Sequence, residues 1–369
     1  MKRLLASAVT GLIALALVTA CGQRPDVDAG APAVTDTLTS APLDAGLITD
    51  RFGWVLSTDA VLLTRDGGKT FQKTAVNVPA GSARAAYFTD ASHGWVAALG
   101  GTGIAVARTA DGGRSWTAST IPTKARIAEL SVAFTDAKRG ALVAREQTGG
   151  AFSLADLYAT TNGGASWRAG TAPVAGRVAV DTAGQIWLAG GVLGNELYSS
   201  ANGGGSWAKA RFSLSDGGAP QAVALPANGV VSVSVSEGDR SRVGLLTSTD
   251  NGVSWRETGA VRTATDTAVA PAVSVARDLS VAVADPAGGR LARVAAADRS
   301  TAAVTPMPAQ GLPAGVSRMG MVGSAGWALA SSGSCAGEKQ DCVITHSLVA
   351  TTDNGATWHE LLRWVEKLS

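Results

Sequence analysis

The sequence predicts an all-β fold, a seven-bladed β-propeller of four-stranded antiparallel blades, from three observations. An eight-residue motif recurs six times: Ser or Thr, any residue, Asp or Asn, any residue, Gly, any residue, Ser or Thr, aromatic. The copies follow each other at near-regular steps, and four short apolar runs accompany each copy. Repeats of about 40–50 residues are typical of propellers, whose ring closure protects the edges of the blades.

The spacing of the motif indicates seven units. Its Asp or Asn moves in steps of 45, 51, 40 and 48 residues, and then jumps by 103. A decayed copy near the midpoint of that jump keeps Asp298 but lacks the Gly and the Trp. The six intact copies have their acidic or amide residue at Asp66, Asp111, Asn162, Asn202, Asp250 and Asp353.

Each unit contains four short apolar runs that we interpret as strands. The second run often opens with Gly-Trp, as in Gly94-Trp95-Val96-Ala97, and the third, such as Ile104-Ala105-Val106-Ala107, leads into the motif. Short apolar runs between clusters of Gly, Asp, Asn and Ser favour antiparallel strands. Helical periodicity is rare, and we expect one short helix over residues 360–368.

The motif has a physical interpretation as the turn between the third and fourth strands. Asp and Asn side chains accept hydrogen bonds from nearby backbone N–H groups, and the Gly supplies a positive φ angle. The aromatic residue packs inward as a large apolar plug. Because the motif returns in unit after unit, we interpret its carboxylates as structural, and not as catalysts or metal ligands.

These copies resemble the Asp-box, or bacterial neuraminidase repeat, of sialidases, sortilin-type receptors and xyloglucan-degrading hydrolases. The Gly-Trp strands combined with boxes in a seven-fold array are most similar to the photosystem II assembly-factor family and its bacterial relatives. The resemblance covers roughly residues 44–360. It implies the fold and the structural role of the boxes, because unrelated activities share this motif.

The N-terminus predicts export and a lipid anchor. Lys2 and Arg3 precede an apolar run from Leu4 to Ala20, which is typical of a signal peptide. Its end resembles the lipobox of bacterial lipoproteins, so we expect acylation, including palmitate, at Cys21. An ordinary signal peptide with an incidental Cys is the alternative. The predicted location is the extracytoplasmic face of the cell membrane.

The predicted organisation is a signal peptide at 1–20, a lipidated Cys with a flexible linker at 21–43, and the propeller at 44–369. The linker is rich in Pro, Ala, Asp and Thr, and typically reaches roughly 25 Å. It is also open whether part of it adds a strand to the ring.

The charge balance argues against nucleic acid as a partner. The chain has 31 Lys and Arg against 29 Asp and Glu, and Lys2 and Arg3 leave with the signal peptide. The mature chain is therefore neutral by this count, and no cluster of basic residues interleaved with aromatics occurs. We expect a monomer.

The remaining cysteines, Cys335 and Cys342, lie in a loop between the second and third strands of the last blade. A disulfide is the natural interpretation outside the cytoplasm, worth about 2.5 kcal/mol in the chain-entropy model. A redox-active pair is the alternative, although the spacing is not Cys-x-x-Cys.

Catalytic motifs are scarce. His93, His346 and His359 have no metal-ligand spacing, and no nucleophile elbow or phosphate-binding loop occurs. We therefore predict neither a cofactor nor a metal. The Phe/Tyr-Arg-Ile-Pro motif of sialidases is absent, and packing explains Tyr158 and Tyr198. A sialidase-like glycoside hydrolase acting on surface glycans remains the alternative, because a carboxylate pair from different blades leaves no sequence motif.

The leading functional hypothesis is a non-catalytic binding or assembly module for an envelope protein or glycan. Propellers bind partners through loops around the ring, so the loops between second and third strands are candidates. These are residues 145–152, the run Glu237 to Arg242 and the Cys335–Cys342 loop. The most polar of them carries Glu237, Asp239, Arg240 and Arg242. A solvated hairpin tip is the alternative for this run.

Overall fold

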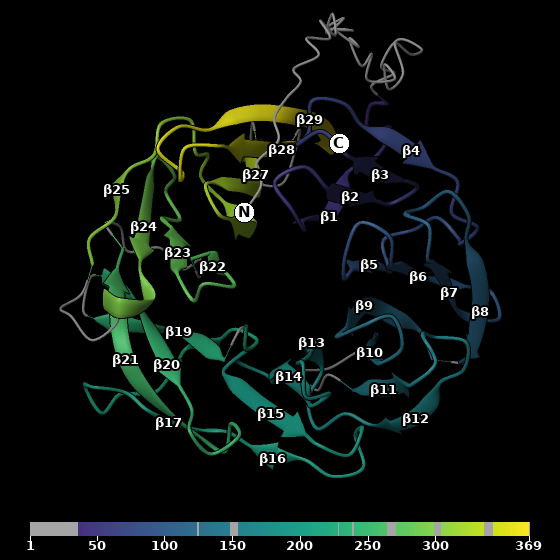
Figure 1. The fold of residues 1–369 in the computed structure, drawn as a ribbon, viewed down its shortest axis with the longest axis horizontal. Helices are drawn as coiled ribbons and strands as arrows, with labels where there is room; N and C mark the ends of the chain where they lie inside the picture. Colours follow the sequence, from purple (N-terminus) through teal and green to yellow (C-terminus); the bar gives the residue numbers. More distant parts are fainter. Residues whose placement is uncertain are drawn as a thin grey trace, which may run out of the picture. The chain divides into compact units, whose positions relative to one another are not determined.

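A computed structural model describes residues 36–123, 125–147, 154–227, 229–237, 240–263, 271–298, 304–335 and 342–368. The described residues form seven sheets, and each sheet has at least four antiparallel strands in chain order. The sheets are arranged as blades around a central channel (Figure 1). The predicted seven-bladed propeller is confirmed.

Blades 1 to 4 are contiguous segments of the chain. Blade 1 contains β1 (Pro42–Leu47), β2 (Gly53–Ser57), β3 (Val61–Thr64) and β4 (Gln72–Thr74). Blade 2 contains β5 (Arg84–Phe88), β6 (Gly94–Gly100), β7 (Gly103–Thr109) and β8 (Thr117–Pro122). Blade 3 contains β9 (Ile127–Phe134), β10 (Gly140–Glu146), β11 (Ala155–Thr160) and β12 (Arg168–Thr171). Blade 4 contains β13 (Gly176–Val180), β14 (Ile186–Gly190), β15 (Glu196–Ser200) and β16 (Ala208–Lys209).

Blades 5 to 7 follow the same plan with two variations. Blade 5 contains β18 (Ala222–Val223), β19 (Val230–Glu237), β20 (Arg240–Thr247) and β21 (Ser254–Arg262), with β17 (Arg211–Ser213) added in parallel outside β21. Blade 6 contains β22 (Val273–Val275), β23 (Val281–Ala284), β24 (Arg290–Val294) and β25 (Met307–Pro308), with a 3-10 turn at Ala296–Asp298. Blade 7 contains β26 (Val316–Val322), β27 (Ala325–Cys335), β28 (Cys342–Thr351) and β29 (His359–Leu368).

Within each blade the chain runs from the channel outward, and this defines two faces of the ring (Figure 1). Antiparallel strands place the first-to-second turns and the third-to-fourth turns at one face, which we call the box face. The starts of the first strands and the second-to-third loops lie at the other, the loop face. The register confirms this arrangement, because Arg145 at the end of β10 pairs with Glu129 near the start of β9.

The core lies between the blades. The described buried apolar residues form seven clusters, and each cluster joins two neighbouring blades. Burial falls outward along a blade: all of β2 and β3 is buried, whereas β4 is exposed or half-buried. Burial of apolar surface between blades therefore stabilises the ring as a whole.

Arginine side chains also connect neighbouring blades. Arg108 of blade 2 donates from Nη1 to the Asn162 carbonyl in the box of blade 3, over 2.9 Å. Arg168 of blade 3 donates to the box of blade 4. Arg65 and Arg293 make the corresponding bonds from blade 1 to blade 2 and from blade 6 to blade 7.

Among the described residues the ring closes without strand exchange. Blade 7 and blade 1 are each built from one continuous segment, and no described strand crosses the seam between them. Phe71 and Trp327 pack across this seam with ring centroids 6.0 Å apart. An ion pair of 3.0 Å joins Arg318 Nε to Asp44 Oδ1.

Each intact box forms the predicted turn between third and fourth strands. In blade 1 the Thr64 hydroxyl donates to the Asp66 carboxylate and accepts a hydrogen bond from the Gly68 N–H. Gly68 has a positive φ angle of 94°. Asp66 also accepts both the N–H and the hydroxyl of Thr70. The amide boxes keep this network, but there the amide N–H donates to the last hydroxyl. The full network recurs at Asp111, Asn162, Asn202, Asp250 and Asp353.

Two expectations about the ends of the ring need comment. Residues 360–368 belong to strand β29, so the predicted helix is wrong. This strand pairs with β28 along its length: His359 lies opposite Ala350 at one end, and Leu368 lies opposite Cys342 at the other. Pairing along ten residues outweighs the helical propensity of Glu, Leu, Arg and Lys. At the other end, β1 begins at Pro42, two residues before the predicted boundary, and the Asp36 N–H donates to the Phe71 carbonyl.

Candidate functional site

Five charged residues gather where the channel opens on the loop face. They lie on the first strands of five blades and line a cavity of about 250 Å³. Because the first strands surround the channel, side chains near their starts converge there although they are far apart in sequence. We call this set the charged mouth: Asp44, Arg84, Glu129, Arg177 and Arg318.

Both carboxylates of the charged mouth have arginine partners. Asp44 pairs with Arg318 at 3.0 Å, and Glu129 pairs with Arg145 at 3.0 Å. Burial raises the pKa of Asp44, and the Arg318 charge opposes this rise. Each carboxylate therefore compensates one guanidinium.

Arg84 and Arg177 form no ion pair with a carboxylate of the charged mouth, although the charge of Asp59 outside it acts on Arg84. Arg84 is 6% exposed and donates from Nη1 to the Ser57 carbonyl over 2.7 Å, while its Nε has no hydrogen-bond partner. Burial lowers the pKa of Arg84, but an arginine stays charged at neutral pH. Arg177 is exposed and forms no ion pair with another described residue. The charged mouth thus favours an anionic group.

The opposite end of the channel is more apolar. All seven blades contribute to a cavity of about 720 Å³, lined by the ends of the first strands and the turns that follow them. Phe88, Phe134, Trp187 and Met321 are among its apolar residues. The two ends of the channel therefore differ in chemistry, and only the loop-face end combines several arginines.

The predicted binding loop lies on the same face as the charged mouth. Glu237 and Arg240 are opposite each other in the backbone register at the end of the β19–β20 hairpin. Asp239 lies outside the described residues. Arg242 differs from the expectation of an exposed patch, because it is 3% exposed and forms ion pairs with Asp216 and Glu257. Burial of the guanidinium is costly, and the two carboxylates compensate its charge.

The predicted disulfide is present. Cys335 and Cys342 are bonded and face each other across the β27–β28 hairpin, with Cα atoms 4.0 Å apart. Their hairpin is also on the loop face. In the candidate loop at 145–152, Arg145 forms an ion pair with Glu129, and residues 148–152 lie outside the described residues. The predicted lipidation site, Cys21, also lies outside them.

The box carboxylates are poorly suited to acid catalysis. Hydrogen bonds from the Ser254 hydroxyl, its N–H and the Ser248 hydroxyl lower the pKa of Asp250 to about 2. Such a group stays ionised and has its acceptor sites occupied. Tyr158, in a third strand, has its pKa raised to about 12 by burial and by the nearby Asp156, which opposes formation of a phenolate nucleophile.

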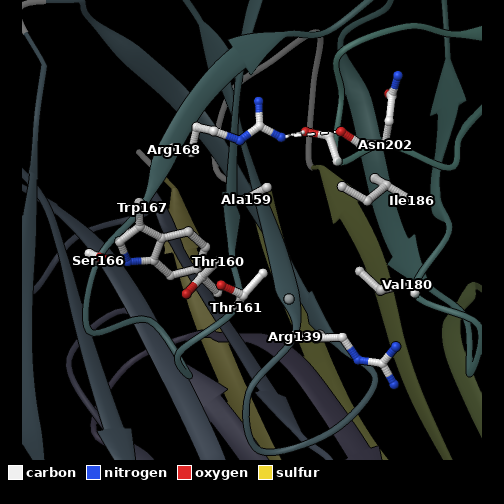
Figure 2. A pocket seen from close by; sticks show the side chains of 13 residues that line it. Arg139, Ala159, Thr160, Thr161, Ser166, Trp167, Arg168, Val180, Ile186 and Asn202 are labelled. Atoms are coloured by element: carbon white, nitrogen blue, oxygen red, sulfur yellow. Dashed lines mark hydrogen bonds between the residues drawn. The ribbon is translucent and has the colours of Figure 1, made fainter.

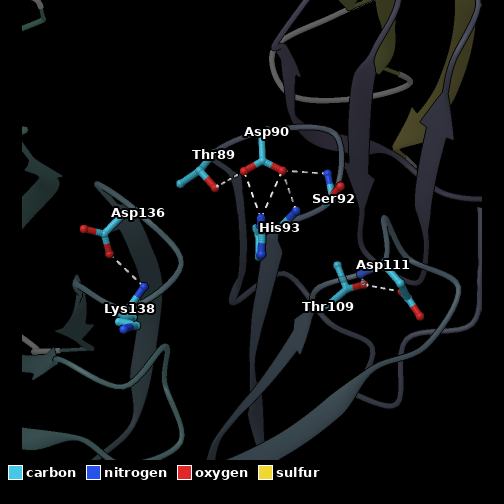
Figure 3. A network of polar contacts seen from close by, with 8 residues as sticks. All are labelled: Thr89, Asp90, Ser92, His93, Thr109, Asp111, Asp136 and Lys138. Carbon is cyan, nitrogen blue, oxygen red and sulfur yellow. Dashed lines mark hydrogen bonds and ion pairs between the residues drawn. The ribbon is translucent and has the colours of Figure 1, made fainter.

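The histidines also have structural partners. Figure 3 shows Asp90 in the β5–β6 turn, where it accepts the N–H groups of Ser92 and His93 and contacts the His93 ring at 2.9 Å. His346 contacts the Ser331 hydroxyl at 2.8 Å. No group of three or more His, Cys, Asp or Glu arranged for a metal occurs in the described part of the chain. The same residues include no helix long and apolar enough to cross a membrane.

Sequence reasoning did not find the charged mouth. Its residues are single charges at the starts of apolar runs, separated by 40 or more residues, and no local motif marks them. The available signal was positional: Arg84 and Arg177 each stand at or next to the first residue of a first strand. Only the closed ring brings these positions together.

Comparison with known proteins supports the family resemblance. Residues 32–179, about two fifths of the chain, match the family of photosynthesis system II assembly factor YCF48. This match spans blades 1 to 3 and the first strand of blade 4. No curated protein sequence matches the chain significantly.

Solved structures show the same fold at low identity. YCF48 bound to D1 peptide is 18% identical, with 80% of this chain and 90% of that chain covered and a TM-score of 0.51. A streptogramin B lyase is 11% identical, with 79% and 92% covered and a TM-score of 0.53. YCF48 from Cyanidioschyzon merolae is 18% identical, with 89% and 86% covered and a TM-score of 0.41. The resemblance to assembly-factor propellers is thus confirmed at the level of fold and of a partial family match.

Proposed function

We propose that this propeller is a non-catalytic binding or assembly module that holds an acidic, extended segment of a partner protein at the charged mouth. The observation that carries the proposal is the surplus of arginine at one end of the channel. Arg177 is exposed there, and Arg84 lines the same cavity. Guanidinium groups bind carboxylates through paired, charge-assisted hydrogen bonds.

The comparisons support a protein as the partner. YCF48, which shares the fold and matches blades 1 to 3 as a family, is bound to a D1 peptide in a solved structure. The β19–β20 and β27–β28 hairpins lie on the same face and are further candidates for contact with such a peptide. The partner class is inferred from the site, and the partner's identity is left to experiment.

The proposal includes a location. The signal peptide at 1–20 and acylation of Cys21 would tether the propeller to the extracytoplasmic face of the membrane. The linker would let the ring move above the membrane surface, within reach of envelope proteins. Two acyl chains provide a stable anchor, because each buried CH2 contributes about 0.8 kcal/mol.

Affinity capture with a charge-reversal variant tests the proposed function. Tethered wild-type protein and the Arg177→Glu variant are crosslinked in the native envelope, and the captured proteins are quantified by mass spectrometry. We expect a partner with an acidic segment whose recovery falls at least about tenfold in the variant, as the loss of a charge-assisted contact predicts.

Arg114→Glu is the matched control. Arg114 is an exposed arginine in the box of blade 2, on the box face, so its reversal changes the net charge equally but leaves the charged mouth intact. Equal loss with both variants, or capture that is insensitive to Arg177→Glu, would contradict the proposed site.

A further inference from the structure

A second cavity lies on the box face, in the interface between blades 3 and 4. In blades 1, 2, 4 and 7 the second residue of the second-strand motif is a tryptophan, whereas in blade 3 it is Ala141, and the second strands of blades 5 and 6 also have no tryptophan. The strand register shows that Ala141 and the four tryptophans occupy equivalent positions. In each of these five blades the residue just before this position pairs with the first residue of the box. The pairs are Gly53–Thr64, Gly94–Thr109, Gly140–Thr160, Ile186–Ser200 and Gly326–Thr351. The four tryptophans are Trp54, Trp95, Trp187 and Trp327.

These indoles fill the interfaces to the following blade. Trp95 of blade 2 is 1% exposed and stacks on Phe134 of blade 3, with ring centroids 3.7 Å apart. Its Nε1 donates to the Gly163 carbonyl in the box of blade 3 over 2.9 Å. Trp187 of blade 4 also contacts Gly252 in the box of blade 5, although its Nε1 donates to Asp181 of its own blade. The indole thus occupies the space beneath the next box.

The interface between blades 3 and 4 has a cavity of about 390 Å³ at the corresponding place (Figure 2). Val180, which is equivalent to Phe134, lines it together with Ile186 and Ala159. Gly203, which is equivalent to Gly163, also borders it. The cavity therefore coincides with the space that an indole fills in the neighbouring interface, and its volume is in the range of small-molecule sites.

Two arginines reach this cavity, and they differ in charge compensation (Figure 2). Arg139 forms an ion pair with Asp136 at 2.9 Å. Arg168 donates from Nη2 to the carbonyls of Gly203, at 2.6 Å, and Asn202, at 3.3 Å. A carbonyl does not neutralise a guanidinium, and Arg168 has no carboxylate partner among the described residues. Its other N–H groups are available to a ligand.

We propose that this cavity binds a small planar aromatic carboxylate. The aromatic ring would lie against Val180 and Ile186 beneath the box of blade 4, as the Trp95 indole does one interface earlier. The carboxylate would accept hydrogen bonds from Arg168. This site is on the box face and is independent of the charged mouth, so its failure would leave the proposed function untouched.

Isothermal titration of the mature propeller with indole-3-acetate tests the inference, with neutral indole as a second probe. We expect 1:1 binding of indole-3-acetate that Ala141→Trp abolishes, because the introduced indole fills the cavity. Arg168→Gln should weaken indole-3-acetate at least about tenfold and leave neutral indole nearly unchanged.

Arg108→Gln is the matched control for Arg168→Gln. Arg108 makes the same type of bond to the box of blade 3, in the interface that already contains Trp95. Its replacement should leave the titration unchanged. A cooperative thermal unfolding transition is the criterion that each variant is folded. Absence of binding up to millimolar ligand, or binding that Ala141→Trp leaves unchanged, would overturn the proposal.

Discussion

Replacement of Trp95 by alanine probes the interface between blades 2 and 3. The side chain is 1% exposed, stacks on Phe134 and donates its indole N–H to Gly163. A buried tryptophan removes about 200 Å² from water, worth about 5 kcal/mol at 25 cal/mol per Å² as an upper value. Measured tryptophan-to-alanine changes in protein cores cost about 3–5 kcal/mol. We expect the free energy of unfolding to fall by about 4 kcal/mol.

Urea denaturation followed by circular dichroism measures this loss. The loss lowers the urea concentration at the midpoint of unfolding, while the slope of the free energy against urea concentration stays unchanged. A pair of phenylalanine variants separates packing from hydrogen bonding. The Trp54 Nε1 is buried without a partner, so Trp54→Phe should cost about 1 kcal/mol less than Trp95→Phe. A loss below about 2 kcal/mol for Trp95→Ala, or equal costs for the two phenylalanine variants, would refute the reasoning.

Three further predictions concern the anchor, a box and a buried ion pair. Cys21→Ala should move the protein from the membrane fraction to the soluble fraction without changing its circular dichroism, and an unchanged membrane fraction would contradict lipidation. The Thr357 hydroxyl and N–H lower the pKa of Asp353 to about 2, so this carboxylate stabilises the fold above its ordinary pKa of 3.8 and loses that contribution as pH falls towards 2. Asp353→Asn should therefore flatten the dependence of Tm on pH between 5 and 2, and identical slopes would argue against the network. Glu257→Ala should cost about 3 kcal/mol in urea denaturation, because it removes a carboxylate partner of the buried Arg242, and a cost below 1 kcal/mol would show that the pair is replaceable.

The architecture was predictable because its signal is local. Each box completes its hydrogen bonds within seven residues, from Thr64 to Thr70 in blade 1, so every copy carries its own turn. The β29 strand was not predictable in this way, because its conformation depends on nine residue pairings with β28. Local composition alone favours a helix there, and tertiary pairing overrides it.

The candidate sites depend on ring closure, and this limits what the sequence predicts about them. Arg84 and Arg177 are 93 positions apart and meet only because five first strands surround one channel. The blade 3 cavity had a readable signal, since Ala141 stands where blades 1, 2, 4 and 7 have tryptophan. The significance of that alanine emerged only once the Trp95 indole was located in the neighbouring interface.

The seam between blades 7 and 1 has a consequence for how the ring is assembled. No described strand is shared across it, so the sheet of each blade comes from one continuous stretch of chain. The sheets can then form one after another during synthesis, without waiting for the C-terminus. Docking of Trp327 against Phe71 and of Arg318 against Asp44 then closes the circle, and this step needs both ends of the propeller.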